Sequence, residues 1–234
     1  MIRALARGFL GAKSGVRGMS TSETYAAGTS AAEFYAEENL KRRYYYLLDS
    51  RGQLFLASTK HRNFASSLKD RKTLSLMGKM MRPINEDDRK LLESLANFPA
   101  NHSPSDYRFV SLCGKEKNFI ATEDDIASVC FTDLEKKADD SKDESEVVSN
   151  RLQYFGGTLS EEFDPKSLVL GDTGRLYHKL KEHRHLSNTI GLLHPSLVQE
   201  LMSSITVTQA HGAGNGRASY EFVYKGQPYR LGHL

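Results

Sequence analysis

Two stretches of the chain carry the same succession of local signals, and this internal match limits the fold more than any other feature of the sequence. Residues 52–55 (GQLF) align with residues 174–177 (GRLY), and residues 60–64 (KHRNF) align without a gap with residues 182–186 (EHRHL). In both stretches, strand-forming residues flank a turn that contains Asp and Gly. That pattern is typical of a β-hairpin.

A helix and a second hairpin are predicted after each of these first hairpins. Apolar residues recur there at helical spacing, and they are Leu74, Met77 and Met81 in the first stretch and Leu197, Leu201 and Ile205 in the second. Similar strands follow at residues 107–110 (YRFV) and 220–223 (YEFV), and each leads through a glycine turn into a short apolar run. We therefore predict an α+β fold of two related β-hairpin–helix–β-hairpin units, at residues 44–132 and 151–234, packed as one globular domain.

An acidic segment separates the two predicted units. Residues 133–146 hold seven acids and three Lys but only one Leu and one Ala. Such a segment buries too little apolar surface to offset the entropy of ordering it. Residues 133–146 are therefore predicted to lack regular structure, within a linker at residues 133–150. The polar stretch at residues 20–43 is predicted to be a flexible lead-in.

The first 19 residues are basic and amphipathic. Their charged residues are Arg3, Arg7, Lys13 and Arg17, and the segment has no acid. Together with its spaced apolar residues, this composition is typical of a mitochondrial presequence. We expect cleavage near Met19 and a location in the mitochondrial matrix. The four positive charges exceed the formal net charge of +3, so the remaining chain is expected to be slightly acidic.

The sequence offers few features that suit catalysis, metal binding or insertion into a membrane. Cys113 and Cys130 are the two cysteines, and their spacing forms neither a disulfide framework nor a zinc pattern. His178, His183 and His185 lie close together, but their spacing matches no recurrent zinc motif. We expect no metal and no cofactor. No run of roughly 18–20 apolar residues occurs, so no membrane span is expected.

Residues 123–125 (EDD) form a short acidic run. Its carboxylates could bind a hard cation such as magnesium, or they could cap the positive end of a following helix. We favour the helix cap.

Charge is segregated along the chain. Residues 41–82 contain 11 Lys or Arg and two acids, whereas residues 83–146 contain 16 acids and eight bases. A basic region of this kind suits an anionic partner, unless its charges form a solvated face that pairs with the acidic segment. The cations of interest are Lys41, Arg42, Arg43, Arg62, Lys69, Arg71, Lys72, Lys79 and Arg82. The adjacent Tyr44, Tyr45 and Tyr46 could add stacking surface for single-stranded RNA.

The favoured hypothesis is a non-enzymatic binding or assembly protein that contacts RNA, a ribonucleoprotein or an acidic protein. The alternative is an enzyme whose site lies in a groove between the two units. His61 and His183 occupy equivalent positions in the internal match and are the candidate residues of that groove.

Several short sequence motifs resemble those of one family of uncharacterised proteins. They are residues 52–56 (GQLFL), 113–119 (CGKEKNF), 156–157 (GG), 174–178 (GRLYH) and 199–201 (QEL), in that order along most of the chain. The family is the one whose human member is named as an open reading frame on chromosome eight. The resemblance implies a mitochondrial protein of unknown function and assigns no catalytic residue. The chain departs from the family pattern at Ile126, where a proline is expected, and in its longer acidic segment.

Overall fold

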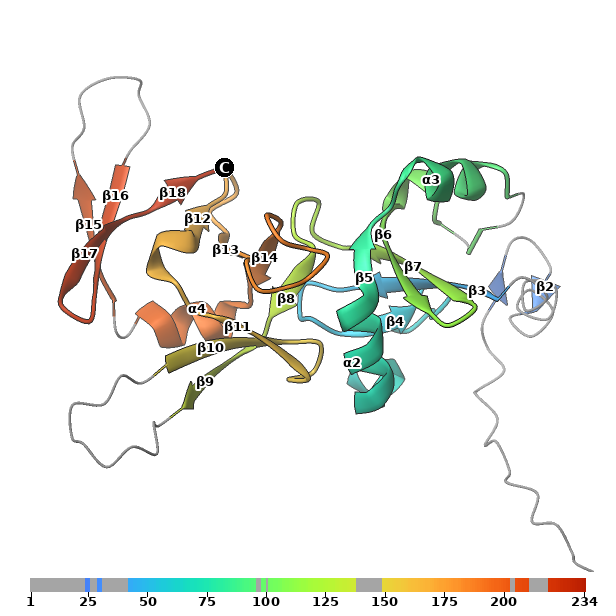
Figure 1. Cartoon of the computed structure of the whole chain (residues 1–234), viewed down its shortest axis with the longest axis horizontal. Helices are drawn as coiled ribbons and strands as arrows, with labels where there is room; N and C mark the ends of the chain where they lie inside the picture. The colour runs from blue at the N-terminus through green and yellow to red at the C-terminus, as the bar shows by residue number, and fades with distance from the viewer. Residues whose placement is uncertain are drawn as a thin grey trace, which may run out of the picture.

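The computed structural model describes residues 24–25, 29–30, 42–95, 98–99, 101–137, 149–202, 205–210 and 219–234. Over these residues the chain is a mixed α+β domain, in which small sheets pack with the helices α2 (Arg71–Met80), α3 (Glu86–Glu93) and α4 (Pro195–Met202) (Figure 1). Short 3-10 turns are η1 (Phe64–Ser66), η2 (Pro104–Asp106) and η3 (Pro165–Ser167). None of the described helices has both the length and the apolar character needed to cross a membrane. The predicted presequence and Lys41 lie outside the described residues.

The first sheet is mixed and has the strand order β4-β3-β7-β6-β5. Its members are β3 (Arg43–Leu48), β4 (Leu54–Leu56), β5 (Met81–Pro83), β6 (Tyr107–Cys113) and β7 (Glu116–Thr122). β3 and β4 form the first predicted hairpin, and β6 and β7 form the second. β3 pairs with β7 in parallel, so the two hairpins join into one sheet.

Alternation along β3 divides the core of this sheet between its two faces, because successive side chains of a strand point to opposite sides. Tyr45 and Leu47 belong to an apolar cluster that includes Leu92 of α3. Leu48, with the half-buried Tyr46 beside it, packs in the larger cluster that includes Leu74 of α2. The two helices therefore cover opposite faces of one sheet (Figure 1).

Helix α2 forms where the sequence predicts a helix. Asp70 caps its N-terminus by accepting the Thr73 N–H at 2.7 Å, a role for which a short polar side chain is well suited. Leu74 and Met77 are buried. The helix ends at Met80, and Met81 already belongs to β5.

The second sheet has the strand order β18-β12-β13-β14-β8. Its members are β8 (Val129–Phe131), β12 (Leu168–Leu170), β13 (Leu176–Lys179), β14 (Ile190–Leu193) and β18 (Gly232–His233). β12 and β13 form the predicted hairpin. β8 was expected inside the first unit at 44–132, but it pairs in parallel with β14 and so belongs to the second sheet. Its three residues are buried, although it is the edge strand of this sheet.

A further small sheet continues the second unit, with the order β15-β16-β17. Its strands are β15 (Ile205–Ala210), β16 (Ser219–Tyr224) and β17 (Gln227–Arg230). β17 is separated from β18 by Leu231 alone, and β18 runs parallel to β12. When β17 and β18 are taken together, the order β13-β12-β18/β17-β16-β15 has the same pairing directions as β4-β3-β7-β6-β5. The duplication itself stays a prediction.

Residues 133–146 of the acidic linker were predicted to lack regular structure, and this prediction is wrong at its start, where β9 forms. A three-stranded sheet with the order β11-β10-β9 contains β9 (Asp133–Lys137), β10 (Ser149–Tyr154) and β11 (Leu159–Glu162). β9 forms because its backbone pairs with β10 and because Leu134 packs against the core. Residues 138–148 lie outside the described residues. The lead-in contains the paired two-residue strands β1 (Thr24–Tyr25) and β2 (Thr29–Ser30).

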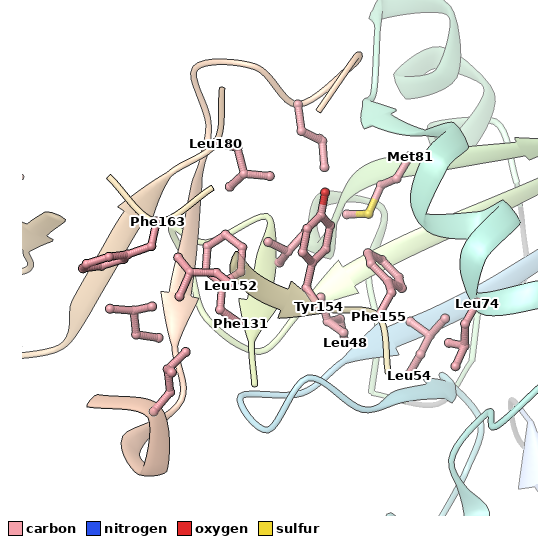
Figure 2. Packing of buried hydrophobic residues seen from close by; sticks show 14 of the residues in the cluster. Leu48, Leu54, Leu74, Met81, Phe131, Leu152, Tyr154, Phe155, Phe163 and Leu180 are labelled. Carbon is pink, nitrogen blue, oxygen red and sulfur yellow. The ribbon is translucent and has the colours of Figure 1, made fainter. Parts of the chain in front are cut away.

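The largest apolar cluster spans both predicted units and joins them into one globular domain. Figure 2 shows Tyr154 and Phe155 of the β10 end between Leu74 and Met81 on one side and Phe131 on the other. Tyr154 and Phe131 meet edge to face, with ring centroids 5.4 Å apart. The segment that follows the acidic stretch therefore supplies the centre of the core.

Candidate functional site

Part of the predicted basic surface gathers around one hollow on α2. This hollow has a volume of about 500 Å³ and is lined by Arg71, Lys72, Ser75, Leu76 and Lys79 of the helix and by Gly157 and Thr158 of the β10–β11 turn. Lys72 and Lys79 are both exposed. Three cations line it, and no acid does so among the described residues.

A close approach at Gly78 places the β10–β11 turn against the helix. A Cβ atom at Gly78 would lie 2.6 Å from a methyl carbon of Leu159 and 2.9 Å from the ring of Phe155, so only glycine fits there without a shift. The turn itself runs through left-handed backbone at Phe155, Gly156 and Gly157, with φ of 50°, 63° and 71°. Figure 1 shows the tip of this hairpin beside α2.

Arg71 ties the turn to the start of the helix. Its two terminal guanidinium nitrogens donate to the carbonyl oxygens of Gly156 and Gly157 at 3.5 and 3.4 Å. These long hydrogen bonds hold the cation at the edge of the hollow. Lys72 and Lys79 supply the other two charges of the hollow. Their side chains are flexible point charges.

The other cations of the predicted basic surface have different roles. Arg82 forms an ion pair with Asp88 at 2.7 Å, and Asp88 is 1% exposed. Burial favours a higher pKa for Asp88, but hydrogen bonds from Lys117 and Arg82 outweigh it, so the pKa is lowered. Arg82 is therefore a structural cation of the first sheet.

Four more of these cations do not line the hollow. Arg42 lies 3.9 Å from Glu116 in a partly exposed ion pair. The ammonium of Lys69 lies 4.3 Å from the centre of the exposed Phe64 ring. Arg43 is half-buried in β3, and Arg62 is exposed. The hollow therefore gathers three of the nine predicted cations.

The tyrosines next to the basic run do not form a stacking platform. Tyr45 is fully buried, with its ring centroid 5.2 Å from that of Tyr107 and 5.9 Å from that of Phe119. Burial, with the negative charges nearby, raises the pKa of Tyr46 to about 12. Tyr44 is half-exposed and belongs to neither core cluster, so the stacking prediction is wrong for Tyr45 and stays a prediction for Tyr44.

The two histidines of the predicted groove occupy opposite environments. His61 is exposed on the loop before η1. His183 is buried, and its Nε2 donates to the carbonyl of Gly78 at 2.8 Å, while its Nδ1 accepts the N–H groups of His185 and Leu186. Burial lowers the pKa of His183, and the Gly78 hydrogen bond opposes this only in part. His183 therefore fastens the second unit to α2 and does not line an open groove.

The acidic run at residues 123–125 caps a turn rather than the predicted helix, because β8 follows it. The Asp124 carboxylate accepts the N–H groups of Ile126 and Ala127 at 3.0 and 2.8 Å. It also accepts hydrogen bonds from Arg175 and from the Tyr177 hydroxyl at 2.9 and 3.1 Å. Burial works to raise the pKa of Asp124, but these hydrogen bonds outweigh it and lower the pKa.

A pocket lies between the two predicted units, but neither His61 nor His183, the candidate residues of the predicted groove, lines it. It has a volume of about 370 Å³ and is lined by the β3–β4 turn, the β12–β13 turn, β14 and the start of α4. Arg51, Arg175 and His194 are its charged or titratable residues. The two aligned hairpin turns can be recognised in the sequence. The sequence does not show, however, that turns so far apart in the chain meet in the fold.

The Cys130 thiol is buried. Burial, together with the charges of Asp49 and Asp124, raises the pKa of the Cys130 thiol to about 12, so its thiolate is not accessible near neutral pH. Within the part of the chain that the structure describes, no three His, Cys, Asp or Glu side chains gather in a way that could hold a metal ion.

These features define a class of protein: an α+β domain that presents a basic hollow on one helix and a separate pocket between two hairpin turns. The chain belongs to a family that carries the description Domain of unknown function (DUF4505), and the match covers residues 35–234. The prediction from short sequence motifs that the chain belongs to an uncharacterised family is therefore confirmed. No solved structure matches the chain.

Proposed function

We propose that the protein is a non-enzymatic binding or assembly factor that holds RNA, alone or within a ribonucleoprotein, on the basic hollow of α2. One observation carries the proposal: three cations surround one hollow, and none of the described lining residues is acidic. Cations on a protein surface bind nucleic acid chiefly through phosphates, with release of counterions. Arg71, Lys72 and Lys79 supply the positive charge of the hollow.

The spacing of the two lysines suits an extended polyanion. Lys72 and Lys79 are seven residues apart on α2, which is about 10 Å along a helix axis. They can therefore contact different phosphates of one strand. Arg71, fixed by the turn carbonyls, marks one end of the hollow. The exposed Leu76 between them adds an apolar contact.

A charge reversal of the hollow tests the proposal. The variant Lys72→Glu/Lys79→Glu is compared with Arg89→Glu/Lys90→Glu, which makes the same change of charge at exposed positions of α3. Binding to a labelled single-stranded RNA is followed by fluorescence anisotropy at two salt concentrations. We expect the α2 variant to bind at least about 10-fold more weakly, and its salt slope to fall by about 0.7 for each phosphate that the protein no longer neutralises.

The outcomes separate three possibilities. Equal weakening in both variants would mean that net charge alone governs binding, and the hollow would lose its role. A wild-type protein that binds polyglutamate but no RNA would make an acidic protein the partner. Absence of binding to either polyanion would overturn the proposal.

The location and ancestry of the chain are part of the same proposal. The basic amphipathic residues 1–19 support import into the mitochondrial matrix with cleavage near Met19. An unprocessed cytosolic chain as the sole cellular form would contradict this. The shared order of pairing in the two units supports an internal duplication, and the matching words support the family whose human member is an open reading frame on chromosome eight.

A further inference from the structure

The pocket between the two hairpin turns has the composition of a small-molecule site and lies away from α2. Its floor is made by four apolar side chains, Leu176, Leu192, Leu193 and Val198. Its rim is made by Ser50, Arg51, Arg175 and His194, together with Gly174 and Pro195. Small-molecule sites are mostly apolar with a few convergent polar groups and begin at about 300 Å³, a range that includes the 370 Å³ of this pocket.

Both arginines are held in place from behind by buried carboxylates. Arg51 binds Asp49 through Nε at 2.9 Å, and Arg175 binds Asp124 through Nη1 at 2.9 Å. Each of these hydrogen bonds uses one of the five N–H donors of a guanidinium group. The side chains of both arginines stay 52% exposed. The carboxylates thus position the arginines and leave donors for a ligand.

His194 adds a donor whose direction is fixed by the start of α4. Its Nδ1 accepts the backbone N–H of Ser196 at 3.3 Å and lies 2.6 Å from the Ser196 hydroxyl. Because Nδ1 is an acceptor, the hydrogen of the neutral ring is on Nε2. The titratable groups of the rim are therefore all donors.

The donors on the rim favour an anion with an apolar body. The charges of Arg51 and Arg175 are balanced nearby by Asp49, Asp124 and the exposed Glu123, whose carboxylate accepts the Ser50 N–H at 2.7 Å. No acid belongs to the described lining, and Asp49 and Asp124 are 7% and 6% exposed, so they lie beneath the arginines rather than in the opening. Guanidinium groups bind carboxylates with paired, charge-assisted hydrogen bonds. The leucines and Val198 would cover the apolar part of the same molecule.

We infer that this pocket binds a small organic carboxylate, with its head group on Arg51, Arg175 and His194 and its apolar chain against the floor between β14 and α4. The two units each supply one hairpin turn to the site. The ligand would therefore stabilise their arrangement, since it binds the folded chain and not the unfolded one.

The test uses the full protein and three probes that separate the two ends of the ligand. Octanoate carries both the head group and the chain, acetate carries only the head group, and octanol carries only the chain. Isothermal titration calorimetry is expected to show binding of octanoate with a Kd below about 1 mM and binding of the other two at least about 10-fold more weakly, as expected when one or more charge-assisted hydrogen bonds or buried methylenes are missing.

Two variants locate the site. Arg51→Gln is expected to weaken octanoate binding about 10- to 100-fold. It should fold normally, because Asp49 still accepts the backbone N–H groups of residues 51 and 53. Val198→Trp is expected to abolish binding by filling the floor while leaving every cation of the rim. Arg89→Gln on α3 is the matched control and should bind like the wild type.

The results also separate this inference from the proposed RNA site. Lys72→Glu/Lys79→Glu should retain octanoate binding, and Arg51→Gln should retain RNA binding. A wild type without measurable octanoate binding, or an Arg51→Gln variant that binds equally well, would overturn the carboxylate site and would leave the basic hollow untouched.

Discussion

The two units place aligned residues in different surroundings, and the two histidines show this most clearly. His61 and His183 follow their hairpins at equivalent distances, yet His61 is exposed and His183 is buried against Gly78 of the other unit. Phe55 and Tyr177, also aligned, are both buried, but only the tyrosine bonds Asp124 across the units. Side chains of the second unit therefore make contacts that hold the domain together. The first unit instead keeps an exposed, charged surface.

The largest expected effect comes from the aligned aromatic pair. Phe55→Ala should lower the free energy of unfolding by about 3–5 kcal/mol, because a fully buried ring is replaced by a cavity. Tyr177→Phe should lower it by only about 1 kcal/mol, since packing is kept and one hydrogen bond to Asp124 is removed. Urea unfolding measures both. If the tyrosine variant were as unstable as the alanine variant, the contact between the units would be stronger than we infer.

The next effect is a loss of stability in acid that belongs to the second unit. Burial lowers the pKa of His178 to about 4, and the ring is fully buried. Because the unfolded chain takes up this proton at higher pH than the folded one, the stabilising contribution is complete above about pH 6.5 and is lost as the pH falls to about 4. It amounts to about 3 kcal/mol at most.

His178→Gln removes this titration while keeping an acceptor for the Asp164 N–H, which Nε2 now accepts at 3.0 Å. The difference in unfolding free energy between about pH 7 and about pH 4.5 should therefore be smaller in the variant than in the wild type. Identical pH profiles would show that His178 takes up its proton over the same pH range in the folded and the unfolded chain.

The smallest effect compares the two aligned histidines directly. His183→Ala should lower the free energy of unfolding by about 2 kcal/mol, because it leaves the Gly78 carbonyl and two turn N–H groups without their partner. His61→Ala is the matched control and should change stability by less than about 0.5 kcal/mol. Thermal unfolding distinguishes them, and equal effects would contradict the division of roles between the units.

Local elements of the fold were predictable from the sequence, because their signals are local. The turn residues at 49–52 and the apolar spacing of Leu74 and Met77 predicted β3, β4 and α2, which the structure contains. The strand β9 was not predictable from composition, since it depends on pairing with β10 and on the burial of Leu134. The strand β8 was misplaced for a similar reason: its partner β14 lies about 60 residues further along the chain.

The candidate site was predicted in part. Clustering of charge identified Arg71, Lys72 and Lys79, which do share one hollow. It could not show that Arg82 is neutralised by an ion pair. Its partner Asp88 lies in α3 and comes close to Arg82 only because the chain turns between β5 and α3. The sequence suggested a groove between the units but not the residues of this pocket, because Arg51 and Arg175 are distant in sequence and meet only in the folded domain.

The parallel pairing of β3 with β7 has a consequence for the order in which the domain assembles. Leu48 is paired with Thr122. The first sheet can therefore form completely only after the chain between these two residues has been brought together. Closing a long loop is entropically unfavourable, and topologies rich in such distant pairings fold slowly. In a nascent chain, β3 therefore keeps one edge unpaired until β7 has been made, and a chaperone could bind that open edge during this interval.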